Sequence, residues 1–170
     1  MKILLAATIG LAAAAALAAC SHPAPAVAPG ATSAARGAQL VALGGCNDCH
    51  TPRLPNGQPD VSRELSGFPA GGTLPPTVAG ADLVETNGAF RGPWGLSLAR
   101  NITSDKSDGI GSWTQAEFIK TLRTGIDPAG HAIQPPMPWQ DYVHVPDADL
   151  IAIYNYLLTV PASTNKVDGS

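Results

Sequence analysis

Three side chains that can bind metals or form covalent bonds lie close together in the stretch GCNDCH, namely Cys46, Cys49 and His50. If this stretch is one turn of helix, positions i and i+3 lie on the same side, so both sulfur atoms face one object. Three kinds of chemistry fit the spacing: a zinc site, a reversible disulfide, and the covalent attachment of a haem. Other features of the sequence distinguish these three alternatives.

The first two alternatives lack the partners that they require. A zinc ion needs a fourth ligand, which structural sites usually draw from a second CxxC or from a His pair at fixed spacing. Neither pattern occurs, and His131 and His144 stand outside any such pair. A thioredoxin-like disulfide centre needs a βαβ pattern, whereas a predicted helix and no strand precedes Cys46. Haem attachment is therefore favoured.

The sequence Cys-x-x-Cys-His is the attachment motif of c-type haem, in which two thioethers hold the ring and the His lies under the iron. An iron that shuttles electrons needs a second axial ligand, and QPPMPW at 134–139 supplies Met137. The prolines on both sides of this residue stiffen the loop, and a Met/His pair raises the reduction potential. His131 and His144 are the alternative sixth ligands.

The opening twenty residues, MKILLAATIGLAAAAALAAC, are typical of an export signal, with one Lys and then an Ala-rich apolar run. A spanning helix is the alternative, and the run is at the short limit for it. Residues 17–20 resemble a bacterial lipobox, which implies an acylated Cys20, a bacterial membrane anchor and a domain facing the periplasm. Ser21 favours the outer membrane. An exported chain is where c-type haems are attached.

Composition bounds the class of protein. The chain has 170 residues, of which 45% are apolar and 14% charged, which predicts one globular domain. A formal net charge of −3 without any Lys/Arg run argues against nucleic acid or an anionic membrane surface as a charge-recognised partner. Trp, Tyr and Phe number only three each, so a group other than protein is expected to fill part of the core.

Helical patterns precede and follow a long irregular region. Helices are predicted at 34–43, at 114–125 with a Thr-x-x-Glu capping box and a closing Gly, and at 146–160. Residues 51–100 are rich in turn dipeptides and show no sustained period, so they either wrap something large or bind a partner. Because no strand is predicted, the expected fold class is all-α.

These patterns divide the chain into four parts. We expect a lipoprotein signal peptide at 1–19, a lipidated Cys with a Pro/Ala-rich tether at 20–33, a folded domain at 34–162 and a C-terminal tail at 163–170.

The motifs CNDCH, WTQAEFIKTLRTG (113–125) and PPMPW (135–139), with the final helix carrying Tyr154 and Tyr156, together resemble the single-haem class I c-type cytochromes. The segments CHTP, GPWGLS and NITSD are similar to those of a periplasmic bacterial subgroup, which includes electron-accepting subunits of membrane dehydrogenases. The resemblance covers about residues 34–162. It implies a cytochrome c-like fold of a few helices around one covalent haem.

The resemblance also implies roles for further residues. The first and last helices should cross near the haem, with Trp113 and Trp139 beside it, and residues 51–100 should cover its propionates. Arg100, Asn101 and Arg123 are candidate propionate contacts, since charge-assisted bonds to carboxylates favour Arg.

The expected function is electron transfer by one haem c, bound through Cys46 and Cys49 and ligated by His50 and Met137. The partners would be a redox donor and acceptor in the periplasm or membrane, including a dehydrogenase or oxidase chain. No catalytic residue and no small-molecule substrate are expected. The alternative is a haem-based ligand-binding or sensing module with a labile sixth position; a peroxidase-like enzyme is weaker, because the chain has only one CxxCH.

Overall fold

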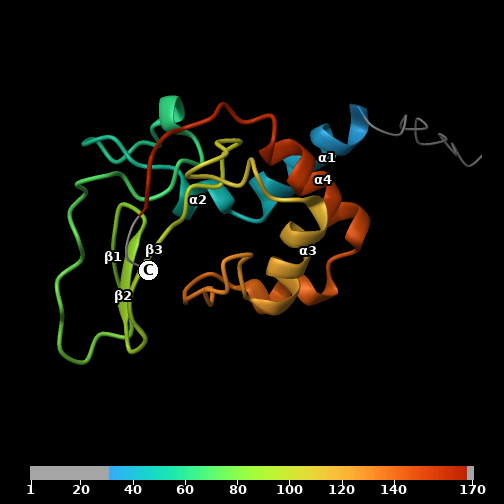
Figure 1. Cartoon of the computed structure of the whole chain (residues 1–170). Helices are drawn as coiled ribbons and strands as arrows, with labels where there is room; N and C mark the ends of the chain where they lie inside the picture. Colours follow the sequence, from blue (N-terminus) through green and yellow to red (C-terminus); the bar gives the residue numbers. More distant parts are fainter. Residues whose placement is uncertain (1–30, 168–170) are drawn as a thin grey trace, which may run out of the picture.

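The computed structural model of the chain describes residues 31–167. Figure 1 shows helices at one end of the molecule and a small sheet with long loops at the other. The elements are α1 (Ala31–Leu43), α2 (Cys46–His50), η1 (Val61–Arg63), β1 (Val84–Thr86), β2 (Ala89–Gly92), β3 (Gly95–Leu98), α3 (Gln115–Thr124), η2 (Trp139–His144) and α4 (Asp147–Leu157). The proposed signal peptide, Cys20 and the tether up to residue 30 lie outside the described residues. Within 31–167, no helix is long and apolar enough to cross a membrane.

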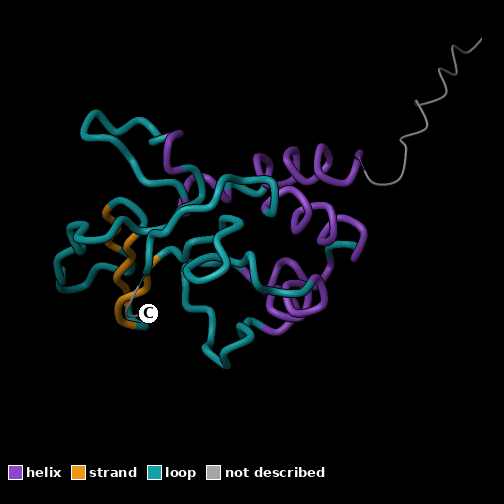
Figure 2. The backbone as a smooth tube through the Cα atoms, turned by 45° about the horizontal axis from the view of Figure 1, so that its top comes forward, coloured by secondary structure: helices purple, strands orange, loops and turns teal. Residues whose placement is uncertain are grey.

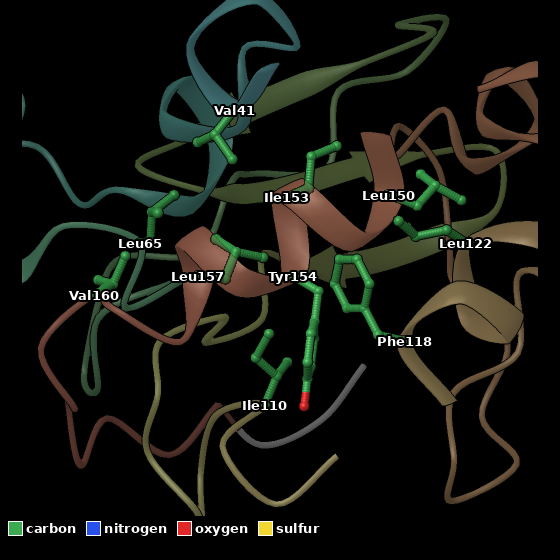
Figure 3. Close-up of a cluster of buried hydrophobic side chains, with 10 residues drawn as sticks. All are labelled: Val41, Leu65, Ile110, Phe118, Leu122, Leu150, Ile153, Tyr154, Leu157 and Val160. Carbon is green, nitrogen blue, oxygen red and sulfur yellow. The ribbon is translucent and has the colours of Figure 1, made fainter. Parts of the chain in front are cut away.

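The main core forms where α1, α3 and α4 meet. The rings of Phe118 of α3 and Tyr154 of α4 lie next to each other (Figure 3), with their centroids 5.5 Å apart. The Tyr154 hydroxyl donates a hydrogen bond of 2.7 Å to the Trp113 carbonyl just before α3, which ties the two helices together. The buried apolar members of this core are Val41, Leu65, Ile110, Phe118, Leu122, Leu150, Ile153, Tyr154, Leu157 and Val160.

The predicted capping of α3 is confirmed. The Thr114 side chain accepts from the Glu117 amide at 3.2 Å, and Glu117 Oε2 accepts from the Thr114 amide at 2.7 Å. Gly125 closes the helix at φ 68, a left-handed conformation that favours glycine. The other two predicted helices exist as well, although α1 begins earlier than residue 34 and α4 ends before residue 160.

The expectation of an all-α fold is wrong, because β1, β2 and β3 form an antiparallel sheet in sequence order. Figure 2 shows these strands in orange, on one side of the molecule, and most of the helices in purple on the other. Thr86 pairs with Ala89 across a two-residue turn, in which Asn87 has φ 47 and Gly88 has φ 86. Two positive φ angles in an Asn-Gly pair are typical of a type I′ hairpin turn. The strands have three or four residues each, too few for an alternating pattern to stand out.

A second, smaller core lies against this sheet and contains Phe68, Ala89, Leu98 and Val167. Val167 belongs to the segment after α4, which runs back across the molecule to the sheet, drawn in red in Figure 1. We call residues 161–167 the C-terminal strap. It joins the helical end of the molecule to the region 51–100.

Candidate functional site

One cavity of about 660 Å³ brings together the four residues that the sequence predicts to bind a haem. Cys46, Cys49, His50 and Met137 all line it, although Met137 is far from the others along the chain. Residues from β3, α3 and α4 supply further apolar lining, including Leu98, Phe118 and Ile153. The volume is in the range of cavities that bury most of a small organic ligand. The fold therefore assembles one mainly apolar site around two thiols, an imidazole and a thioether.

The two thiols lie on the short helix α2, as the i, i+3 spacing predicted. Gly45 lies directly before α2 and has a left-handed conformation at φ 65, which allows a sharp turn between α1 and α2. Both cysteines are free thiols, and burial raises the pKa of each of them. They are thus held as neutral, partly buried sulfurs that face the cavity from one helical turn.

The His50 ring is oriented by a backbone carbonyl. Its Nδ1 lies 2.7 Å from the carbonyl oxygen of Arg100. A carbonyl only accepts hydrogen bonds, so Nδ1 carries the proton and Nε2 keeps its lone pair as a ligand. Burial lowers the pKa of His50, which also favours the neutral, ligating form. Metal-bound histidines are usually fixed by such a second hydrogen bond.

Met137 lies in the loop between α3 and η2 and is partly buried against the main core. Two contacts fix this loop. The Ser97 hydroxyl of β3 donates to the Pro135 carbonyl, and the Trp139 ring packs directly on Gly125. A Cβ added at Gly125 would lie 2.4 Å from the Trp139 ring. Glycine at this position is therefore needed for the close approach of the loop.

Tyr142 is a site residue that sequence reasoning missed. It lies on η2 and lines the cavity together with Cys46. Burial, together with Cys46, raises the pKa of Tyr142 to about 12. No motif in the sequence marks this tyrosine, because its link to Cys46 depends on how the loop after α3 folds back.

The structure separates the other predicted contacts into two groups. Trp113, Arg100 and Asn101 line the cavity, whereas Trp139 and Arg123 are not among the lining residues of the described chain. Arg123 instead donates to the carbonyls of Tyr142 and Val145 and to the Asp147 carboxylate. Its position fits a clamp that holds η2 rather than a contact to a ligand in the cavity.

The two alternative histidine ligands differ in position. His131 lines the cavity but is exposed, and its Nδ1 lies 3.1 Å from an Asp127 carboxylate oxygen. His144 is exposed and is not part of the described lining. Among residues 31–167, no group of three or more His, Cys, Asp or Glu side chains is placed to hold a metal ion. This arrangement gives no support to the zinc alternative.

Comparison with known proteins adds relatives with stated roles. No protein-family model matches the chain. It is 32% identical over 124 residues to one of the subunits of nicotinate dehydrogenase from Pseudomonas putida, which is 73% of this chain and 8% of that protein. It is 30% identical over 123 residues to the gluconate 2-dehydrogenase cytochrome c subunit of Pantoea cypripedii, which is 72% of this chain and 22% of that subunit. It is 31% identical over 130 residues to a diheme cytochrome c-type protein of Cereibacter sphaeroides, which is 76% of this chain and 37% of the relative. The chain is homologous to c-type cytochromes.

The cavity agrees with that homology. Cytochrome c relatives imply haem c, and the lining offers the donors that haem c uses: two sulfurs on one helical face, an imidazole with a free Nε2, and a thioether. The resemblance to c-type cytochromes is thus confirmed at the level of the family. The chain spans well under half the length of each of these relatives.

Proposed function

We propose that this cytochrome c homologue transfers single electrons through one covalently attached haem c, with His50 and Met137 as axial ligands. The observation that carries the proposal is the shared cavity, which gathers Cys46, Cys49, His50 and Met137. The single CxxCH in the sequence supports one haem per chain. When bound, haem supplies an iron that accepts one electron from a donor and gives one electron to an acceptor.

Each of these residues has a distinct role in the proposal. Cys46 and Cys49 would hold the haem covalently through their sulfur atoms, so that it could not dissociate. His50 offers Nε2, because the Arg100 carbonyl binds the proton on Nδ1. Met137 would supply a soft sulfur ligand that favours the reduced state. The apolar lining limits water near the iron, which also keeps the potential high.

The proposed partners follow from the names of the relatives. Several relatives are cytochrome subunits of gluconate, fructose and alcohol dehydrogenases, which supports a dehydrogenase as the electron donor. The chain itself would transform no substrate. Acylation at Cys20 and attachment to a bacterial membrane, with the domain on the periplasmic side and the outer membrane favoured, are part of the proposal and rest on the sequence alone.

The test uses full-length protein matured in a host that attaches c-type haem. A pyridine haemochrome assay set against the protein concentration should give one haem per chain. The same assay on a Cys46→Ser/Cys49→Ser double variant should give no covalent haem. Rapid mixing with a one-electron reductant should then reduce the iron in a single step. A haem content of zero or two per chain would refute the one-haem proposal.

Carbon monoxide separates the proposal from the alternative of a ligand sensor. If Met137 occupies the sixth position, the reduced parent protein should show no rapid change in its spectrum on mixing with carbon monoxide. Rapid and complete carbon monoxide binding by the parent would favour the sensing function instead.

A further inference from the structure

The carbonyl that orients His50 belongs to the peptide unit between Arg100 and Asn101, and this unit is held from two sides. Because a peptide unit is planar and rigid, fixing the side chains and neighbours of residues 100 and 101 fixes the direction of this carbonyl. The C-terminal strap supplies one side, and the segment around Gly67 supplies the other.

On the first side, both residues of the peptide unit bind the strap through their side chains. The Asn101 amide, with 3% of its residue surface exposed, donates to the carbonyls of Ser163 at 2.6 Å and Asn165 at 3.1 Å. Its Oδ1 accepts from the Thr103 amide and hydroxyl. The Arg100 guanidinium donates to the Val167 carbonyl at 2.8 Å. The strap thus grips residues 100 and 101 together.

On the second side, the backbone of Gly67 packs against the same peptide unit. A Cβ added at Gly67 would lie 2.6 Å from the Arg100 carbonyl carbon and 2.7 Å from the Asn101 nitrogen. At φ +80, Gly67 also has a conformation that side-chain-bearing residues rarely adopt. Its amide donates to the His50 carbonyl at 2.7 Å. This glycine therefore contacts both His50 and the peptide unit that orients it.

The strap controls this second side as well, through Asn165. The Asn165 amide donates to the carbonyls of Ser66 at 2.7 Å and Phe68 at 2.8 Å, the residues on either side of Gly67. Its Oδ1 accepts from the Ala70 amide at 3.0 Å. Val167 anchors the end of the strap in the second core. One side chain of the strap thus holds the whole segment that packs on the peptide unit.

We propose that the C-terminal strap, through Asn165 and through its hydrogen bonds with Asn101, holds the Arg100 carbonyl against His50 Nδ1. It thereby sets how strongly His50 would donate electron density to a bound iron. This inference rests on the proposed function, because the donation matters only where His50 binds iron. Asn165 and Asn101 are positioning residues that do not touch the iron themselves. A tighter bond at Nδ1 makes the imidazole a stronger donor and stabilises the ferric state. Loosening the strap should weaken this donation and make the iron easier to reduce.

The test compares Asn165→Ala with Asn155→Ala in the haem-bearing protein. Asn165→Ala removes all three bonds to the Gly67 segment, whereas Asn155→Ala removes a 2.7 Å bond to Ser33 between α4 and α1, away from the Arg100 carbonyl. Both variants lose an asparagine and a long-range hydrogen bond, so a general loss of stability affects both. The readouts are the midpoint potential and the exchange rate of the hyperfine-shifted His50 Nδ1 proton in NMR spectra.

Asn165→Ala should favour the ferrous state about tenfold relative to the parent, the lower end of the effect of such outer contacts on metal affinity. For one electron this is a rise of about 59 mV. The Nδ1 proton should also exchange faster than in the parent. Asn155→Ala should leave both readouts at the parent values. If Asn165→Ala cannot be matured, Thr103→Val serves in its place. It removes the hydroxyl that donates to Asn101 Oδ1 and accepts from the Ser163 amide. Its midpoint potential should shift in the same direction as that of Asn165→Ala, but by less.

Two results would overturn the inference in different ways. A haem-bearing parent whose Asn165→Ala and Thr103→Val variants keep the parent potential and proton exchange rate would refute the role of the strap alone. A parent that matures without covalent haem would refute the proposed function, and this inference with it.

Discussion

The crossing of α1 and α4 depends on the absence of a side chain at Gly37. A Cβ at this position would lie 1.9 Å from the Ala152 carbonyl oxygen and 2.7 Å from the Tyr156 Cβ. The first of these atoms is backbone, so no rotamer change relieves the clash. Ordinary contact begins at 3.4 Å, so the helices would have to separate by about 1.5 Å at the crossing. The substitution Gly37→Ala therefore tests whether α1 and α4 pack as described.

The expected loss of stability is the difference between two opposing effects. Overpacking of a well-packed core lowers the free energy of unfolding by about 1–3 kcal/mol. We expect Gly37→Ala to lie near the upper limit, about 3 kcal/mol, because the clashing atom belongs to the backbone and cannot move aside. Alanine in a helix interior gains about 1 kcal/mol over glycine. The net destabilisation is about 2 kcal/mol, which lowers the melting temperature of a domain of this size by about 8 °C. Unfolding of the mature protein in guanidinium, followed by circular dichroism, measures it.

The control for this prediction is Ala35→Gly on the exposed side of α1, which isolates the effect of helix propensity. It should destabilise the protein by about 1 kcal/mol, because the backbone loses the helix preference of alanine without any change in packing. A Gly37→Ala protein as stable as the parent, or more stable, would show that propensity decides at this position. The close helix crossing would then be wrong.

Three further predictions concern the loop that carries Met137 and the cap of α3. Met137→Ala should leave the iron open, so that the reduced protein binds carbon monoxide rapidly; an unchanged six-coordinate spectrum would mean that another residue is the ligand. Arg123→Ala should lower the free energy of unfolding by about 2 kcal/mol, because two backbone carbonyls lose a charged donor. Asp147→Ala removes only the exposed carboxylate that pairs with Arg123, so it should lower the free energy of unfolding by less than about 1 kcal/mol. Equal losses in the two variants would contradict the role of Arg123 in holding η2. Thr114→Ala should cost about 1 kcal/mol through loss of the α3 cap, whereas Thr124→Ala at the other end of the helix should cost clearly less.

Local signals allowed much of the helical part to be predicted. The capping box at Thr114 and the glycine at 125 specify α3 through contacts within a few residues, so no tertiary information was needed. The same holds for Cys46, Cys49 and His50, whose order along one helical turn is itself the signal. Met137 could be proposed because it is the sole methionine beyond the first residue and lies among prolines.

The parts that were missed depend on contacts between distant segments. The sheet was overlooked because its strands are short, although the Asn87-Gly88 pair was a readable hairpin signal. Arg123 was expected at a propionate, but only the folded chain shows that carbonyls of η2 and its cap surround the guanidinium. Residues 163–167 of the C-terminal strap were expected to belong to a tail, since a run such as PASTNKV has no periodicity. Their position depends on the hydrogen bonds of Asn101 and Asn165.

The central claim is that one haem lies in the cavity between His50 and Met137, and an optical spectrum of the matured protein tests it most directly. Oxidised and dithionite-reduced spectra should be recorded together with a pyridine haemochrome. The protein should give a c-type haemochrome, a low-spin reduced spectrum, and a weak long-wavelength sulfur-to-iron band in the oxidised state that disappears in Met137→Ala. A matured protein without covalent haem, or with haem but without this band, would contradict the claim.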